Sequence, residues 1–270
     1  MRSGDRLTQI ARIGFAARGL VYILIGWFAI DVAANGGQLK DNQGALGTLA
    51  GTPMGQILLA VCSLGFVGYA IWRLTEAITD PENRSRDLKG KFERAGYAVS
   101  GITHLVLATA AARLALRQAS AQQGSPGDKS AESWSAWALE HPGGVVLLII
   151  VGVLFLLVAG AQALKAYKAR FDELGGDVPA PAYVRWIGRC GYAARAVIFA
   201  LIGWFVITAA LNQDADRAGG LGEALKQLRA QEQGALVMSI VAFGLLLFGV
   251  FSLIEARYRR IRVATPDFLR

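Results

Sequence analysis

Long stretches without a charged side chain dominate this sequence and decide what it can fold into. Five of them are at least 18 residues long. An α-helix rises about 1.5 Å per residue, so about 20 residues cross the roughly 30 Å hydrocarbon core of a membrane. The apolar residues lack the alternation that a membrane β-strand requires, which favours helices. With 54% hydrophobic and only 18% charged residues, the chain is too apolar for an ordinary soluble domain. The five predicted spans are Gly55–Trp72, Ala95–Ala112, Pro142–Leu164, Ala196–Gln213 and Gln233–Ile254.

A sixth span at the N-terminus is less obvious, because Arg18 and Asp31 leave only 12 uncharged residues between them. The segment Met1–Ala34 could also be interpreted as a secretory signal peptide with a basic start. The same segment, however, recurs in the interior of the chain, where residues 12–28 and 189–205 are identical at 10 of 17 positions. A cleavable signal has no use at an internal position. We therefore expect a retained transmembrane helix, with both charged side chains reaching toward opposite interfaces.

The net charge of +8 is distributed unevenly across the predicted membrane. If the N-terminus is cytoplasmic, the inner segments and adjacent helix ends carry 21 Lys and Arg residues, and the other side carries seven. This excess follows the positive-inside rule, so we expect a multi-pass protein of the plasma membrane with both termini in the cytoplasm. The basic tail Arg257–Arg262 is expected to contact anionic headgroups of the lipid bilayer. Membrane orientation thus accounts for the basic charge, and no nucleic-acid partner is expected.

The chain contains three copies of one two-helix unit. The motif RIGFAAR at 12–18 corresponds to RAGYAVS at 94–100 and to RCGYAAR at 189–195. Each copy holds an even number of spans, so all three copies have the same orientation, which implies a pseudo-threefold axis along the membrane normal. We therefore predict an all-α bundle of six transmembrane helices in a single membrane domain. Its bounds are 1–270, and those of its three parallel helix–loop–helix repeats are 7–81, 92–171 and 183–261.

The outer loop of each repeat contains a short amphipathic pattern. Residues 45–49 (ALGTL) align with 224–228 (ALKQL), and residues 134–137 (WSAW) take the same place in the middle copy. Apolar residues three apart among polar neighbours predict a short helix at the outer membrane interface. Trp134 and Trp137 suit that depth, so we expect them to be interfacial anchors.

Small residues recur seven positions apart on one face of the first helix of each repeat. In membranes such residues allow two helix backbones to approach closely. We therefore expect tight helix contacts at three pairs of positions. These pairs are Gly19/Gly26, Gly101/Ala108 and Ala196/Gly203.

The repeat motifs resemble those of the bacterial membrane family catalogued as domain of unknown function number twelve hundred and six. The resemblance covers nearly the whole chain. It rests on the Arg-x-Gly-aromatic-Ala-Ala-Arg start of the repeats, on LIGWF at 24–28 and 201–205, and on EARYRR at 255–260. It implies three two-helix copies and a bacterial membrane location, and it implies no activity.

Charged residues lie at matching predicted depths in the first and last repeats. Arg18 and Arg195 lie about two turns into their helices, while Glu76 and Glu255 lie near the inner ends of the following spans. Intramembrane charges are costly, about 2.5–3.5 kcal/mol at the centre, and normally pair. We predict ion pairs Arg18–Glu76 and Arg195–Glu255, or their exchange between repeats, with Arg73 joining the first pair.

The middle repeat departs from this pattern. Ser100 replaces the arginine, and Leu164 or Lys165 falls where the glutamate would be. Two interpretations remain for the charged set: a gate or an anion or proton site on the cytoplasmic side, or a clamp that fixes each two-helix unit. The clamp is favoured because the charges lie near the interface, where pairing is ordinary.

Few polar residues lie deep in the predicted spans, and no catalytic, metal-binding or cofactor motif is present. The sequence has no His, Cys and carboxylate spacing typical of a metal site, and no paired histidines at matched depth for haem. It also has no phosphate-binding loop and no nucleophile–base arrangement. A water-accessible axis would need the deeper polar residues to converge. These are Ser100, Thr103, His104, Gln162 and Thr208.

Three classes of function are compatible with this pattern. A non-catalytic structural or assembly role is favoured by the apolar spans and the short outer loops. Transport of a small solute or ion through the pseudo-threefold centre is the alternative, by analogy with mitochondrial carriers, which also triplicate a two-helix unit. Their proline, acidic and basic signature is missing here. An intramembrane enzyme ranks last, so we expect no enzymatic activity and no cofactor.

Overall fold

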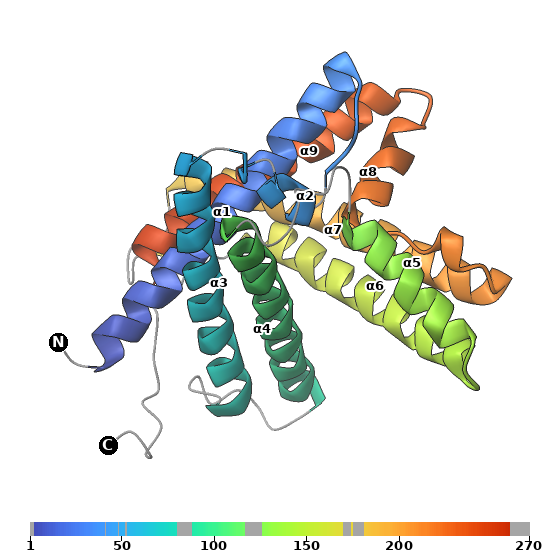
Figure 1. The fold of residues 1–270 in the computed structure, drawn as a ribbon, viewed down its shortest axis with the longest axis horizontal. Coiled ribbons are helices and arrows are strands. Elements are labelled where there is room, and N and C mark those ends of the chain that lie inside the picture. The colour runs from blue at the N-terminus through green and yellow to red at the C-terminus, as the bar shows by residue number, and fades with distance from the viewer. Residues whose placement is uncertain are drawn as a thin grey trace.

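Helices account for nearly all of the described residues in the computed structural model (Figure 1). The structure describes residues 3–40, 42–47, 49–51, 53–79, 88–116, 126–169, 174 and 181–259. Six of the helices in this part of the chain are long and apolar enough to cross a membrane, which confirms the predicted all-α membrane fold. The six are α1 (Ser3–Asn35), α3 (Pro53–Thr79), α4 (Leu88–Ala115), α6 (Gly144–Lys168), α7 (Ala182–Asn212) and α9 (Gly234–Tyr258). The shorter elements are α2 (Asn42–Gly47), α5 (Pro126–Leu139), η1 (Ala215–Arg217) and α8 (Leu221–Arg229).

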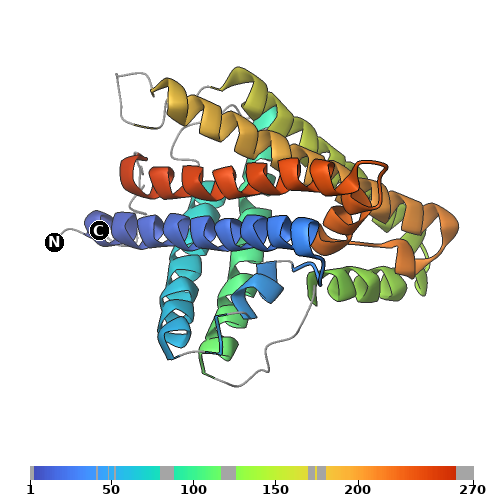
Figure 2. The same cartoon turned by 90° about the horizontal axis from the view of Figure 1, so that it is seen from above.

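The six spans form three tight antiparallel pairs, α3 with α4, α6 with α7, and α9 with α1. Each pair joins the second helix of one repeat to the first helix of the next, and α9 closes the series by packing on α1. Figures 1 and 2 show the three pairs running in clearly different directions around a common centre. The packing unit is therefore shifted by one helix from the sequence repeat, and it repeats three times, as a pseudo-threefold arrangement requires.

Glycine allows the helices of each pair to touch backbone to backbone. A Cβ atom added to Gly19 would lie 2.8 Å from the carbonyl oxygen of Gly249, and one added to Gly26 would lie 2.6 Å from that of Ala242. In the α6–α7 pair, a Cβ atom on Gly203 would lie 2.8 Å from a backbone oxygen of α6. Contacts this close exclude any side chain. Of the small residues predicted seven apart, Gly19, Gly26 and Gly203 thus lie at contacts between repeats.

The two spans of one repeat pack less extensively than the three pairs do. Helix α1 contacts α3, and α7 contacts α9. In the part of the chain that the structure describes, α4 and α6 show no comparable packing, although both belong to the middle repeat. The pseudo-threefold frame is therefore open at the middle repeat, and α6 is the least buried of the six spans.

The short helices cover the end of the bundle where the two spans of each repeat are connected, hereafter the loop end. Helix α5 contacts both α2 and α8. The predicted amphipathic character is clear in α2 and α8, which bury Leu46 and Leu225 completely in the main core. Trp134 and Trp137 of α5 are 68% and 49% exposed, as side chains at a membrane interface would be. The opposite end, where α1 begins and α9 ends, is called the terminal end.

Candidate functional site

A buried network of charged side chains connects α1, α3 and α9 in the terminal half of the bundle. Arg18 of α1 donates to a carboxylate oxygen of Glu255 of α9, with 2.5 Å between Nη2 and Oε2. Its Nε donates to the hydroxyl of Ser252 at 3.2 Å, and its Nη1 to the hydroxyl of Tyr69 of α3 at 2.7 Å. Both members of the ion pair are buried, at 8% exposure for Arg18 and 3% for Glu255. A single guanidinium therefore ties three spans together.

The hydroxyl of Tyr69 joins this ion pair to a second one. Arg73 donates from Nε to the same hydroxyl at 3.0 Å and from Nη1 to Glu76 Oε2 at 2.8 Å. Glu76 is also buried, at 8% exposure. Because Tyr69 accepts from two guanidinium groups, the two pairs form one connected network rather than separate contacts.

A third arginine bonds to the other carboxylate oxygen of Glu255. Arg259, one residue beyond the end of α9, donates from Nη1 to Glu255 Oε1 at 2.6 Å. Aromatic rings enclose the cations: Arg18 lies over Phe15 and Phe248 with its Cζ about 5 Å from each ring centroid. Cations over aromatic faces gain electrostatic stabilisation, more so where water is excluded. The network is thus satisfied by carboxylates, hydroxyls and rings from the chain itself.

The structure selects one of the two pairings that the sequence left open. Among the described side chains, Glu255 pairs with Arg18 and Arg259, so one half of the predicted exchange between repeats is formed, whereas Arg195 pairs with neither glutamate. The pair Arg18–Glu76 is replaced by Arg73–Glu76 within α3. The physical reason is the packing of α9 directly on α1, which brings Glu255 against Arg18.

Arg195 stands apart from the network. Its guanidinium lies over the rings of Tyr22, Phe199 and Phe248, with Cζ 4.4 Å from the centroid of Phe248. Its Nε is buried and has no hydrogen-bond partner in the described structure. The two arginines at equivalent repeat positions, 18 and 195, therefore have different surroundings.

The arginine that begins the repeat motif has a role that the sequence analysis missed. Arg94 donates from Nε to the carbonyl of Ala77 at 2.7 Å and from Nη2 to that of Ile78. Arg189 makes the equivalent bonds, to Ala166 at 3.1 Å and to the next carbonyl of α6 at 3.2 Å. The last carbonyls of a helix have no partner within it, and a cation there is favourable. Each of these arginines therefore caps the preceding span.

Three of the polar residues considered for a central axis, Thr103, His104 and Thr208, bond to carbonyls of their own helices. Thr103 is exposed, and its hydroxyl donates to Val99 of its own helix at 2.9 Å. Thr208 donates to the carbonyl three residues earlier, also at 2.9 Å. His104 Nδ1 lies 2.7 Å from the Ser100 carbonyl, and its ring packs on Tyr69 with 4.3 Å between centroids. These groups are held by their own helices and by α3–α4 packing.

Gln162 is the remaining candidate for the axis. Its Oε1 is buried and has no hydrogen-bond partner among the described residues. It lies on α6, in the same helix pair as Arg195. The two unpartnered groups thus come from the same helix pair, α6 with α7.

Carboxylates gather outside the spans, where α5, η1 and α8 meet. Asp128 accepts a hydrogen bond from the backbone N–H of Gly220 at 2.8 Å. Partial burial, followed by the charges of Asp216, Asp128 and Glu223, raises the pKa of Glu132 above its ordinary value. Protonation of this carboxyl therefore relieves repulsion at the loop end as the pH falls. In the described part of the chain, no three His, Cys, Asp or Glu side chains are grouped to hold a metal ion.

Comparison with known proteins is consistent with the repeats and the fold. A family model described as Domain of Unknown Function (DUF1206) matches residues 13–80, 95–169 and 190–259, one segment for each repeat. The uncharacterized protein YxxB of Bacillus subtilis (strain 168) is 34% identical over 259 residues, which cover 94% of this chain and 92% of that protein. No solved structure matches the chain. The resemblance inferred from the repeat motifs is thus confirmed, and the chain belongs to the DUF1206 family of three-repeat proteins.

Proposed function

We propose that this multi-pass membrane protein is a non-catalytic structural component of the bacterial plasma membrane, with both termini in the cytoplasm. The observation that carries the proposal is the filling of the bundle centre. One continuous core of buried apolar side chains includes residues from seven helices, α1, α2, α3, α4, α7, α8 and α9. Close packing of this kind favours a rigid body over a solute pathway.

The charged network also supports a structural role. Transporters place ionisable groups where they meet a substrate or change partners. Here Arg18 donates to both Glu255 and Tyr69, all three side chains are buried, and they come from three different spans. Breaking such a network is costly, since a buried charge left without its partner destabilises a protein by several kcal/mol, about 3–5. The network therefore acts as a clamp between repeats 1 and 3.

The bilayer is the proposed principal partner. Exposed apolar side chains cover the outer surfaces of α4 and α6, as lipid-facing surfaces require. The excess of Lys and Arg at the terminal end suits contact with anionic headgroups. The basic charge is explained by membrane orientation, so we propose no nucleic-acid partner.

Flux measurements test the structural role against transport. The purified full-length chain is reconstituted into liposomes, and leakage of protons, K⁺ and Cl⁻ is followed under an imposed gradient. Because the centre is packed, we expect rates equal to those of protein-free liposomes. A protein-dependent flux that is reduced by Glu255→Gln would contradict the proposal and favour a transport role for the charged network.

Cysteine accessibility tests the orientation. In a Cys190→Ser background, single cysteines replace the exposed residues Gln38 at the loop end and Lys91 at the terminal end. A membrane-impermeant maleimide is expected to label Gln38→Cys on intact cells, and Lys91→Cys only after lysis, because positively charged segments stay in the cytoplasm. Cys62 is retained in both variants and is buried, so it is expected to stay unlabelled. Labelling of both positions from the same side would overturn the parallel arrangement of the repeats.

A further inference from the structure

The α6–α7 corner of the bundle differs in charge from the other two corners. The contact of Gly203 with Gly152 corresponds to that of Gly26 with Ala242, which places Lys165 at the position that Glu255 occupies in α9. Glu76 holds this position in α3. Two corners therefore carry a buried carboxylate, and the third carries an exposed lysine.

Two buried polar atoms of this helix pair have no hydrogen-bond partner among the described residues. Arg195, the repeat equivalent of Arg18, has a buried Nε without an acceptor in the described structure. On the same helix pair, Gln162 has a buried Oε1 that is also unpartnered. At the positions of Glu255 and Ser252, which bond to Arg18 in the α9–α1 pair, α6 carries Lys165 and Gln162. Among the described side chains, the α6–α7 pair therefore has a cation where the α9–α1 pair has a carboxylate.

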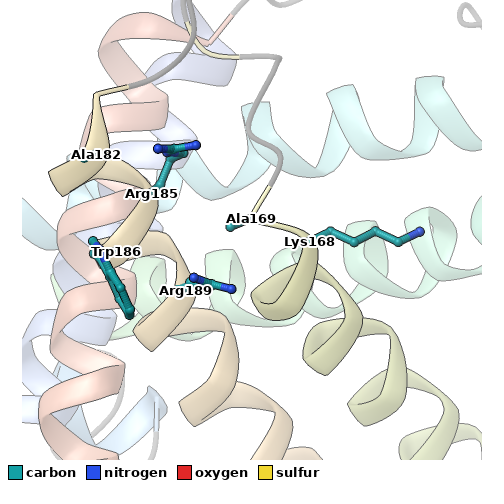
Figure 3. A pocket seen from close by; sticks show the side chains of 6 residues that line it. All are labelled: Lys168, Ala169, Ala182, Arg185, Trp186 and Arg189. Atoms are coloured by element: carbon teal, nitrogen blue, oxygen red, sulfur yellow. The ribbon is translucent and has the colours of Figure 1, made fainter.

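A pocket of about 250 Å³ opens at the terminal end of the same helix pair. It is lined by Lys168, Ala169, Ala182, Arg185, Trp186 and Arg189 (Figure 3). Three of these described lining side chains, Lys168, Arg185 and Arg189, are cationic. Figure 3 shows Arg189 reaching from α7 toward the end of α6, with Arg185 beside it, while exposed Lys168 extends outward on a flexible chain. The volume accommodates a phosphate group with several waters, each of which needs about 30 Å³.

The position of the pocket indicates the source of its ligand. Lys168 is the last residue of the α6 span and Ala182 the first of the α7 span, so the pocket lies at the level of the lipid headgroups. Trp186 is 62% exposed beside it, as is usual for tryptophan at a membrane interface. Helix α7 has no side-chain cap at its N-terminus, so its first N–H groups add donors near the pocket.

We propose that this pocket binds the phosphate group of an anionic phospholipid. Arg189 is oriented by its bonds to the α6 carbonyls, and Arg185 lies one turn before it on α7. Lys168 extends from the end of α6 on a flexible chain that can turn toward a bound phosphate. Basic pockets between spans are a recurrent way of binding anionic headgroups. The site uses the chain's own cations and does not depend on the structural role proposed above.

Lipid titration of the full-length protein in detergent tests the site. Binding of short-chain phosphatidylglycerol and of phosphatidylcholine with the same chains is measured by native mass spectrometry. The variant Lys168→Ala/Arg185→Ala removes two exposed cations of the pocket. Its matched control, Arg113→Ala/Lys129→Ala, removes two exposed cations at the loop end. Gel filtration verifies that both variants are folded.

We expect phosphatidylglycerol to bind more tightly than phosphatidylcholine. The pocket variant should lose roughly 30-fold in affinity, because two surface cations are removed, and the control should lose little. A parallel titration with inorganic phosphate distinguishes the sources of the ligand. If inorganic phosphate binds as tightly as phosphatidylglycerol, and the pocket variant loses that binding, the site is supported and free phosphate is identified as its ligand. Equal binding of both lipids, or unchanged phosphatidylglycerol binding in the pocket variant, would overturn the proposal.

Discussion

Glu255→Gln is expected to destabilise the protein more than any other single change of charge. The glutamine removes the carboxylate shared by Arg18 and Arg259, which lie 2.5 and 2.6 Å from it, and leaves two largely buried guanidinium groups uncompensated. Breaking a buried ion pair on one side costs about 3–5 kcal/mol. For a chain of this size, that corresponds to a drop on the order of 10 °C in the unfolding midpoint. The midpoint is measured in detergent by tryptophan fluorescence, together with the monodisperse yield.

The matched control is Glu223→Gln at the loop end. Glu223 pairs with Lys226 at 3.2 Å, but the lysine side chain is 72% exposed, so this pair contributes at most about 1 kcal/mol. The control should therefore change the midpoint by only a few degrees. A Glu255→Gln protein as stable as the control would refute the clamp, and the network would then need a functional explanation.

Gly249→Val is expected to separate the first and last spans. A Cβ atom at this position would lie 2.6 Å from the carbonyl oxygen of Gly19 and 2.7 Å from a side-chain carbon of Ile23. Both contacts are too short, and the backbone oxygen cannot move without displacing α1. Overpacking in a close-packed core costs about 1–3 kcal/mol, and a forced backbone shift raises the cost to at least about 3 kcal/mol. The unfolding midpoint and the yield of folded monomer are the measurements.

Gly160→Val provides the control for this glycine. Gly160 lies in the α6 span, is exposed, and has nothing within 4 Å of an added Cβ atom. The same substitution there should be neutral or slightly stabilising, because glycine in a helix interior is less favourable than alanine by roughly 0.5–1 kcal/mol. Similar midpoints for the two valine variants would show that the α1–α9 contact is not needed for stability.

Much of the fold follows from local properties of the chain. Span length and apolarity predict six membrane helices, and the motif that recurs at 12–18, 94–100 and 189–195 predicts their threefold repetition. The small residues at Gly19 and Gly26 also mark a real contact surface, because backbone approach depends on residue size alone.

The partner of that surface could not be predicted in the same way. Sequence repetition suggests that the two spans of one repeat pack together, yet the tightest contacts join successive repeats, such as α3 with α4. Either arrangement buries the same small residues. The choice depends on the directions in which the helix pairs cross, which no local pattern in the sequence encodes.

The same ambiguity explains why the charged network was only partly predicted. The sequence places Glu76 and Glu255 at the same predicted depth as Arg18, so depth alone cannot decide which of them pairs with it. The contributions of Tyr69 and Ser252 were missed. A serine hydroxyl in a span usually bonds to its own helix, as Ser252 also does to Phe248. A signal was nevertheless present: a tyrosine four residues before Arg73 lies on the same face of α3.

The pairing of Arg18 with Glu255 has a consequence for how the protein is made. The two residues are 237 positions apart. At about 5–20 residues per second, a ribosome needs roughly 10 to 50 s to travel between them. Throughout that time the newly inserted α1 carries a cation whose carboxylate has not yet been synthesised. The nascent chain must therefore keep Arg18 near the headgroups or in contact with the insertion machinery, and only the final span releases it into the finished protein.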